Sequence, residues 1–292
     1  MEKAIPEAFP CSFDPLDPRF WSEGWARAAQ NSSLAKREIS PERWTMFWNR
    51  ISKDYLVRVG FESQWIEETV RMLLREEVVS EKSLVLDIGS GPGTFTLPLS
   101  RRVRHVVALD AAEKMLDALR MRAEEEGVTN ITCLCKRWEA CDFSKEFDLV
   151  FASFSQAIRS AESLLQMNRA SRSYCCLVTA SDDRHFRERN RLWELIFGEP
   201  FRSSSFHILY PFNYLYSCGF RPEVRFVEKK IRYEEPLAAL IERYEEYFQM
   251  FTELTDPQKE KIRRYFEGRA EGGIVKACEE RAFAIMWWRV ER

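Results

Sequence analysis

The stretch that decides the fold is Leu86-Asp87-Ile88-Gly89-Ser90-Gly91-Pro92-Gly93-Thr94, in which three glycines stand at a spacing of two. An apolar run typical of a strand precedes it, and residues 95–102 predict a helix. Glycine is needed where the chain turns with unusual dihedral angles and where a ligand approaches the backbone itself. A strand-to-helix loop at the carboxyl edge of a parallel sheet is where α/β proteins bind nucleotides. The stretch therefore predicts a ligand-binding loop in an α/β fold.

Strands and helices alternate on both sides of this loop. The expected strands are apolar runs at residues 83–89, 105–110, 131–135, 147–154 and 174–180, separated by helices at 95–102, 113–126 and 161–170. Continuous apolar runs, as opposed to alternating ones, indicate a parallel sheet that is covered on both faces. Right-handed crossovers then give a doubly wound sheet.

The two ends of the chain do not show this regular alternation of strands and helices. Residues 1–38 look irregular, Ser40-Pro41 reads as a helix start with serine as N-cap, and a second helix is expected at 62–77. After residue 180 we expect helices at 184–197, 210–218 and 236–269 and strands at 222–233 and 282–290.

Two common nucleotide motifs do not fit the loop. A dinucleotide site needs G-x-G-x-x-G, but Thr94 stands five residues after Gly89, and no lysine follows as a P-loop requires. The pattern present, D-x-G-x-G-x-G from Asp87 to Gly93, resembles the first signature of the class I S-adenosylmethionine-dependent methyltransferases. The resemblance extends over residues 84–180, about a third of the chain.

That resemblance implies a fold and a division of the chain. The fold is α/β, a doubly wound, seven-stranded, mostly parallel sheet of order 3-2-1-4-5-7-6 with the last strand antiparallel. Residues 1–80 would form an N-terminal helical extension or lid. Residues 81–292 would form the methyltransferase domain, with a helical insertion at about 236–270.

The resemblance also implies a binding site for S-adenosyl-L-methionine. Gly89, Gly91 and Gly93 would let its methionine portion lie against the backbone, Asp87 would help to anchor its ammonium group, and Asp110 would accept its ribose hydroxyls. Asp110 has an alternative role, because Asp110 and Glu113 have the spacing of a capping box. The remaining candidates are Ser90, Ala111, Met115, Trp138, Ser153 and Phe154.

Several of these residues also have a plain structural interpretation. Met115 either covers the adenine or belongs to the helix core, and Trp138 either stacks on the adenine or is a half-buried tryptophan. At that position the family commonly has an acidic residue, whereas this chain offers Arg137 and Trp138. Ser153 and Phe154 are expected to border the transferred methyl group.

Composition narrows the class of molecule that can accept the methyl group. The 44 basic and 46 acidic residues give a net charge of −2, so the basic excess of a nucleic-acid-binding protein is missing. The D/N-P-P-Y/F run of base-amino methyltransferases and the Pro-Cys nucleophile of cytosine-C5 enzymes are also absent. We therefore expect a small organic acceptor and no DNA. The alternatives are an RNA or protein methyltransferase of the same fold, or a catalytically inactive S-adenosylmethionine-binding regulatory protein.

A general base is needed only if the acceptor is a hydroxyl or a carbon acid. His207 is the first candidate because histidine titrates near neutral pH, followed by Asp182 and Asp183. Tyr210 and Asn213 are candidates for orienting the acceptor. A surface or capping role is the alternative for His207. The sequence has no long apolar stretch that predicts a membrane span, no recognisable signal peptide and no C-x-x-C pair. We expect a reduced, cytoplasmic protein without a metal or a membrane partner.

Overall fold

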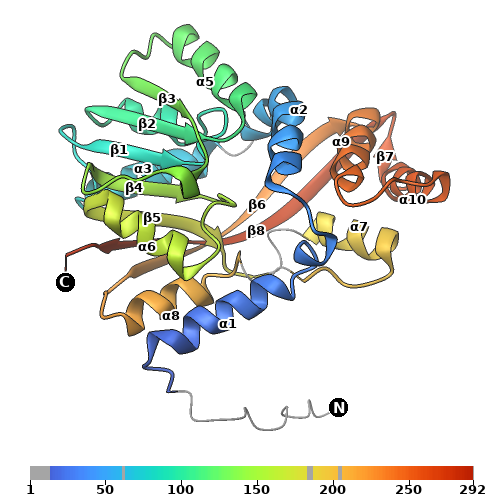
Figure 1. Ribbon diagram of the computed structural model, residues 1–292. Coiled ribbons are helices and arrows are strands. Elements are labelled where there is room, and N and C mark those ends of the chain that lie inside the picture. Colours follow the sequence, from blue (N-terminus) through green and yellow to red (C-terminus); the bar gives the residue numbers. More distant parts are fainter. Residues whose placement is uncertain (1–13, 61–62, 183–186, 203–205, 292) are drawn as a thin grey trace.

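The computed structural model describes residues 14–60, 63–182, 187–202 and 206–291, and the side chains of residues 53–63 lie outside the description. A mixed sheet of order β3-β2-β1-β4-β5-β8-β6 forms its centre, with the short β7 paired to β8 (Figure 1). β1 to β5 run parallel, and β8 is antiparallel to both β5 and β6. The strands are β1 Leu84–Ile88, β2 His105–Asp110, β3 Ile131–Cys135, β4 Phe147–Ser153, β5 Ser171–Ala180, β6 Glu223–Pro236, β7 Ala270–Glu271 and β8 Ile274–Arg289.

The predicted α/β fold and strand order are confirmed. The seven longer strands follow the order 3-2-1-4-5-7-6 when they are numbered along the chain, and β7 adds an eighth, two-residue strand. The helices are α1 Pro18–Gln30, α2 Pro41–Gly60, α3 Ser63–Arg75, α4 Thr96–Ser100, α5 Glu113–Glu125, α6 Ala161–Ala170, α7 Arg187–Phe197, α8 Leu209–Ser217, α9 Leu237–Gln249 and α10 Asp256–Glu267, with 3-10 turns at Ala35–Arg37 and Trp138–Ala140.

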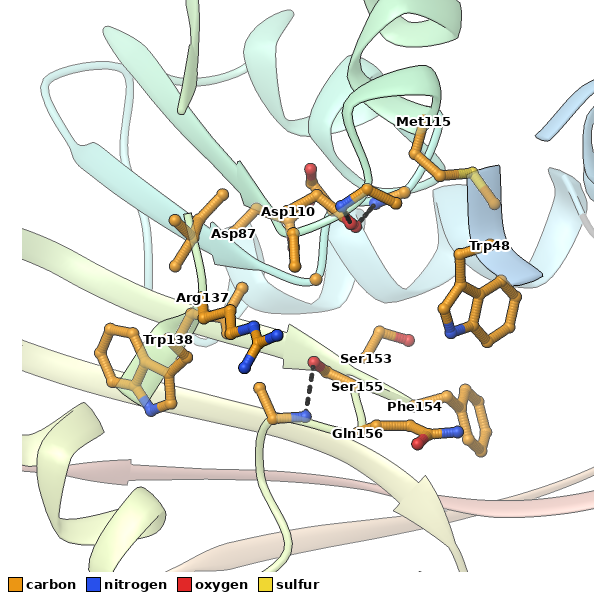
Figure 2. Close-up of a pocket in the computed structure, with 18 of the residues that line it drawn as sticks. Trp48, Asp87, Asp110, Met115, Arg137, Trp138, Ser153, Phe154, Ser155 and Gln156 are labelled. Carbon is orange, nitrogen blue, oxygen red and sulfur yellow. Dashed lines mark hydrogen bonds between the residues drawn. The ribbon is translucent and has the colours of Figure 1, made fainter. Parts of the chain in front are cut away.

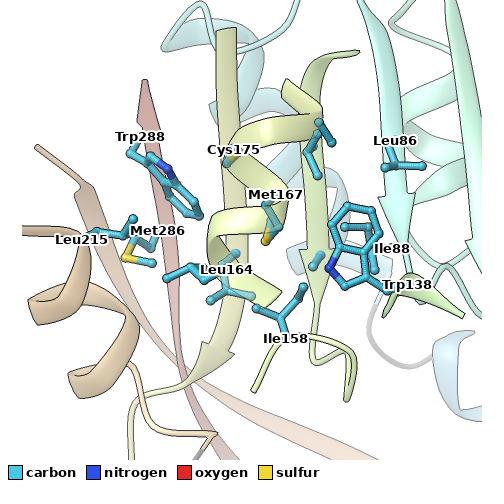
Figure 3. Packing of buried hydrophobic residues seen from close by; sticks show 14 of the residues in the cluster. Leu86, Ile88, Trp138, Ile158, Leu164, Met167, Cys175, Leu215, Met286 and Trp288 are labelled. Atoms are coloured by element: carbon cyan, nitrogen blue, oxygen red, sulfur yellow. The ribbon is translucent and has the colours of Figure 1, made fainter. Parts of the chain in front are cut away.

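Alternate residues of the central strands β1, β4 and β5 enter two cores, one on each face of the sheet. On one face Leu86 and Met286 pack with Leu164 of α6 and Leu215 of α8 (Figure 3). The opposite face packs against α3 and α4 through a second cluster, whose members include Trp65, Val70, Leu73, Val85, Phe95, Val106, Leu149 and Ile285. Burial of both faces explains why the strands are continuous apolar runs.

The antiparallel strands β6 and β8 extend beyond the rest of the sheet. Ala180, the last residue of β5, pairs with Phe283, so β8 before Phe283 continues beyond the carboxyl end of β5 and pairs with β6 and β7. A third apolar cluster joins this extension to α2, α7, α9 and α10, and its members include Phe47, Trp193, Phe248, Phe266 and Val275. The long strands therefore support helices above the carboxyl edge of the sheet (Figure 1).

Three predictions about the outer elements need correction. Residues 18–30 form α1, although 1–38 was expected to be irregular; Asp17 caps α1 and Pro18 opens it. The helix expected at 236–269 is two helices, because Thr255 and Gln258 form a capping box that starts α10. The last strand begins at Ile274, eight residues before the predicted start at residue 282. Residues 1–13 and 184–186 lie outside the described residues.

No helix within the described ranges combines the length and the apolar character that a membrane span requires.

Candidate functional site

A cavity of about 240 Å³ opens where β1, β2, β3 and β4 end. Figure 2 shows side chains from these strand ends and from α2 around it. Its lining residues are Pro41, Trp44, Thr45, Trp48, Trp65, Asp87–Gly91, Thr94, Phe95, Leu109–Ala112, Met115, Lys136–Glu139, Ser153–Ala157 and Arg159. Of the predicted cofactor residues only Gly93 is missing from this set, so the structure brings the others together.

The glycine loop turns tightly between β1 and α4. The amides of Gly89 and Ser90 both donate to the carbonyl of Leu109, at 2.8 and 3.1 Å, which fixes the loop to the end of β2. Gly91 has φ of +54°, and the space where its Cβ would stand is open. Because Gly91 lines the cavity, this open space lets a ligand lie directly against the backbone there.

Gly93 has a different role from Gly91. Its φ is +87°, and a Cβ there would collide with Leu119 of α5 and crowd Leu97. The third glycine therefore lets α5 pack closely against the loop. Gly93 is not among the residues that line the cavity, so its predicted contact with a ligand is not supported.

Asp87 is a buried carboxyl group at the base of the cavity. Thr96 Oγ1 donates to Asp87 Oδ2 at 2.6 Å. Burial raises the pKa of Asp87 to about 7; the hydrogen bond from Thr96 acts against this shift, and the negative charge of Asp110 adds to it. A cation that entered the cavity would favour the ionised form of Asp87.

Asp110 is fixed by two backbone donors. The amide of Gly91 donates to Oδ2 at 2.9 Å, and the amide of Ala112 donates to Oδ1 at 2.8 Å. Burial raises the pKa of Asp110, and both of these hydrogen bonds lower it. A carboxylate has about four acceptor positions, so two remain for hydroxyl groups of a ligand.

The capping box predicted for Asp110 and Glu113 is wrong. Ala112 is the N-cap of α5, and no side chain caps that helix. Asp110 stands two residues before the N-cap, so its carboxylate is available to the cavity and reaches the Ala112 amide from outside the helix.

Three further predicted residues line the cavity in different ways. Ala111 and Met115 do so from the start of α5. Ser90 is 4% exposed, and its Oγ has no hydrogen-bond partner within the described part of the chain. A buried hydroxyl normally has a partner, so Ser90 points to a ligand that supplies one.

Trp138 lies largely in the protein core. It is 2% exposed, packs in the cluster that contains Ile88 and Leu164, and its Nε1 donates to the carbonyl of Ser163 at 3.3 Å. This environment favours the interpretation of Trp138 as a core tryptophan that touches the cavity with one edge. Stacking on the adenine stays a prediction.

Ser153 and Phe154 end β4 at the lower side of the cavity in Figure 2. Phe154 has φ of +46°, an uncommon value for a residue with a Cβ, and its amide donates to the carbonyl of Val178 at 2.9 Å. This backbone turn directs residues 154–157 along the cavity, where Ser155 Oγ accepts from the Ala157 amide at 3.3 Å.

Helix α2 forms the cover of the cavity, through Trp44, Thr45 and Trp48. Arg137 after β3 forms an ion pair with Glu42, which lowers the pKa of Glu42 to about 2. The amide of Lys114 in α5 donates to Asn49 Oδ1 at 3.0 Å. Two polar contacts therefore hold α2 over the site.

The candidate catalytic residues lie outside the cavity. None of His207, Asp182 and Tyr210 lines the cavity. His207 Nδ1 accepts from the Leu209 amide at 3.1 Å, next to Ile208, which is the N-cap of α8. Tyr210 stacks on Trp25 of α1 with 6.3 Å between the ring centroids. Asp183 lies outside the described residues, within which no cluster of three metal-ligating side chains is found.

Sequence reasoning missed several lining residues. Trp65 and Phe95 lie in apolar segments and pack on each other at 5.3 Å between centroids, so nothing in the sequence separates them from ordinary core residues. Gln156 and Arg159 follow β4 directly. Their position after a parallel strand was the available signal, because ligands bind at that edge.

Comparison with known proteins gives the family. Residues 85–173 match the family model described as a methyltransferase domain. This range begins in β1, contains the glycine loop and Asp110, and ends in β5. Residues 85–173 therefore form a methyltransferase domain, and the predicted resemblance to the class I S-adenosylmethionine-dependent methyltransferases is confirmed there. The predicted enzyme class is thereby confirmed at the level of the family, whose members use S-adenosylmethionine.

Relatives of this methyltransferase differ in how much of the chain they match. An uncharacterized protein of Haemophilus influenzae is 27% identical over 229 residues, which cover 76% of this chain and 82% of the relative. A probable ribosomal RNA small subunit methyltransferase A of Methanosphaera stadtmanae is 28% identical over 94 residues, which cover 32% of this chain and 34% of the relative.

A solved structure supports the fold of this methyltransferase. A Bacillus halodurans protein described as a methyltransferase superposes with a TM-score of 0.50 at 16% identity, and the alignment covers 76% of this chain and 99% of the other. At this identity the likeness shows the architecture alone.

Proposed function

We propose that this methyltransferase binds S-adenosyl-L-methionine in the cavity and transfers its methyl group to a small organic molecule. The observation that carries the proposal is the composition of the cavity: the glycine loop and Asp110 form one side, and tryptophans of α2 cover it. A partly aromatic pocket that a helix covers suits a small ligand.

The residues present fit the cofactor. The open space beside Gly91 and the unpartnered hydroxyl of Ser90 leave room and a hydrogen-bonding group for its methionine portion. Asp87 would hold the ammonium group, and the free acceptor positions of Asp110 would bind the ribose hydroxyls. Ala111 and Met115 would lie against the adenine.

The chain's contribution to the reaction is binding and alignment. When bound, the cofactor supplies an electrophilic methyl group on a sulfonium that is already a good leaving group. Ser153 and Phe154 would border this group at the end of β4. Holding an acceptor at about 3–3.5 Å from the methyl carbon, in line with the breaking bond, lowers the barrier without a dedicated acid. The covering helix α2 would exclude water.

An RNA acceptor is the main competing function, and Lys136, Arg137 and Arg159 line the cavity. Arg137, however, is paired with Glu42, and Glu139 lies in the same segment. The charges at the opening are therefore mixed, and the whole chain has a net charge of −2. These observations favour a small molecule over an RNA backbone.

Titration calorimetry with S-adenosylmethionine and S-adenosylhomocysteine tests the proposal. We expect both to bind, and Asp110→Ala to weaken binding by about 10-fold or more, because a hydrogen bond to a charged group contributes about 1.5–3 kcal/mol. Failure of both ligands to bind to folded protein would contradict the proposal.

A methyl-transfer assay then separates the acceptor classes. Radiolabelled S-adenosylmethionine is incubated in parallel with a mixture of small metabolites, with total RNA and with protein extract. Transfer to RNA or protein alone would replace the small-molecule proposal. Cofactor binding without transfer to any acceptor would favour the regulatory alternative.

A further inference from the structure

We infer that the acceptor of this enzyme is a flat, uncharged aromatic molecule that lies between Trp48 of α2 and Phe154 after β4, with a polar substituent bound by Gln156. The inference rests on the proposed function and adds the substrate class and the residues that select it. All three residues line the cavity. Figure 2 shows them on the same side of the pocket, away from Arg137 and Trp138.

The aromatic residues of the cavity fall into two groups. Trp65, Phe95 and Trp138 are 5%, 2% and 2% exposed, so their rings belong mainly to the cores. Trp44, Trp48 and Phe154 are half-buried. Because these three also line the cavity, their remaining exposed surface is the aromatic surface that a ligand can cover.

A second layer of rings holds these three in place. Phe47 packs edge to face on Trp44 at 6.2 Å and on Trp48 at 5.2 Å between centroids. Phe283 packs in the same way on Phe154, at 6.0 Å. Aromatic walls that are fixed before binding lose little conformational entropy when a ligand enters, and they prefer a partner with a flat face.

The cofactor and the acceptor would occupy different sides of the cavity. Asp87 and Asp110, which we assign to the cofactor, lie opposite Phe154 and Gln156 in Figure 2. Ser153 lies between them, at the end of β4, where the methyl group is expected. An acceptor on Phe154 would therefore face the cofactor across Ser153.

The polar groups beside Phe154 are neutral. The Gln156 amide, which can donate and accept, and the Ser153 hydroxyl both line the cavity beside Phe154. A ligand with one hydroxyl, carbonyl or amine group would satisfy the amide of Gln156. This pairing gives the ring a defined orientation toward the methyl group.

Charge argues against an ionic acceptor. A sulfonium cation in the cavity, together with Lys136, Arg137 and Arg159 in its lining, disfavours a second organic cation. The faces of Trp48 and Phe154 carry the negative part of the ring quadrupole, which disfavours an anion stacked on them. A neutral aromatic acceptor avoids both costs.

Calorimetry tests this inference, by titration of small probes into protein that is saturated with S-adenosylhomocysteine. The probes are 2-naphthol, its saturated analogue decahydro-2-naphthol, and tetramethylammonium. We expect 2-naphthol to bind about tenfold more tightly than the saturated analogue, because only the aromatic ring stacks on Trp48 and Phe154. Equal affinity for the two, or tighter binding of tetramethylammonium, would overturn the inference.

Variants locate the binding surface. Trp48→Ala should weaken 2-naphthol about tenfold, Trp48→Phe should restore most of the affinity, and Gln156→Ala should weaken it less than Trp48→Ala. All should bind S-adenosylhomocysteine within about twofold of the unmodified protein. The same holds for the control Met46→Ala on α2, because Met46 is 65% exposed and does not line the cavity. Met46→Ala should also leave 2-naphthol binding unchanged.

Two results would separate this inference from the proposed function. If S-adenosylhomocysteine does not bind to the unmodified protein, the proposed function itself fails. If it binds and Trp48→Ala lowers its affinity as much as that of 2-naphthol, Trp48 belongs to the cofactor site and the acceptor subsite is wrongly placed.

Discussion

Asp87 is a carboxyl group that titrates near neutral pH. Burial and the nearby charge of Asp110 raise its pKa to about 7, from 3.8 for an exposed aspartate. The folded protein therefore keeps a proton that the unfolded chain releases between about pH 4 and pH 7. Because the folded-state pKa is raised, stability from this group is fully present below about pH 4 and is lost as the pH rises toward 7.

The ionisation of Asp87 should also control cofactor affinity. The ammonium group of S-adenosylhomocysteine prefers the carboxylate, so we expect affinity to rise as the pH increases from about 5.5 to about 7.5, by at most about tenfold per pH unit, and then to level off. Calorimetry across this range measures the slope. Asp87→Asn should bind more weakly and with a smaller slope, since the carboxyl group whose pKa is about 7 is then absent. A pH-independent affinity in the unmodified protein would contradict this role of Asp87.

Among the elements, the strands and helices nearest the glycine loop were the most predictable. β2 and β3 begin and end at the predicted residues, because Arg104 and Asn130 precede these apolar runs and Asp110 and Lys136 mark their ends. The carboxyl ends of β1, β2 and β4 also placed Asp87, Asp110 and Ser153 at one edge of the sheet. The local sequence pattern and the sheet topology were together enough to predict the strand-end residues of the site.

The outer elements were harder to predict, although their signals were present. Asp17-Pro18 before α1 is the same cap-and-proline signal as Ser40-Pro41 before α2, but the prolines and scattered aromatic residues of this segment favour an irregular structure. The first half of β8 mixes apolar and charged residues, with three consecutive charges at Glu279–Arg281, and this half extends beyond the parallel strands. Which of the α2 side chains face the cavity depends on tertiary packing, so Trp48 could not be separated from core residues by spacing alone.

Helix α2 is held to the cofactor side of the cavity by its ion pair with Arg137. Both side chains are largely exposed, so Glu42→Gln should leave the unfolding transition nearly unchanged. It should nevertheless speed the dissociation of S-adenosylhomocysteine by about two- to fivefold, because α2 opens more easily. Since the pKa of Glu42 is lowered to about 2, the pair stays intact through the pH range in which Asp87 titrates.

Stopped-flow displacement of S-adenosylhomocysteine measures this rate. Glu23→Gln is the matched control, because Glu23 forms an exposed ion pair with Arg27 on α1, away from the cavity. Identical dissociation rates for Glu42→Gln and the unmodified protein would show that the ion pair does not hold the cover closed.

Across the whole molecule, the N-terminal helices complete both cores of the sheet. Trp25 of α1 is 1% exposed and packs with Tyr210 and Tyr214 of α8. Trp65 of α3 contacts Phe95 and Phe283 on the opposite face. The division into an extension of residues 1–80 and a domain of residues 81–292 stays a prediction, but these contacts indicate that the two parts unfold together.

Replacement of Trp25 tests this coupling. Trp25→Ala should lower the free energy of unfolding by about 3–5 kcal/mol, the usual cost of deleting a large buried aromatic side chain, while a single transition is retained. Met121→Ala on α5, where the methionine is 62% exposed, is the control and should change stability by less than about 0.5 kcal/mol. Because Trp25 does not line the cavity, affinity for S-adenosylhomocysteine should persist where the variant is folded. If urea denaturation shows unchanged stability, α1 does not contribute to the core of the domain. If a second transition appears, the N-terminal helices unfold independently of the rest of the chain.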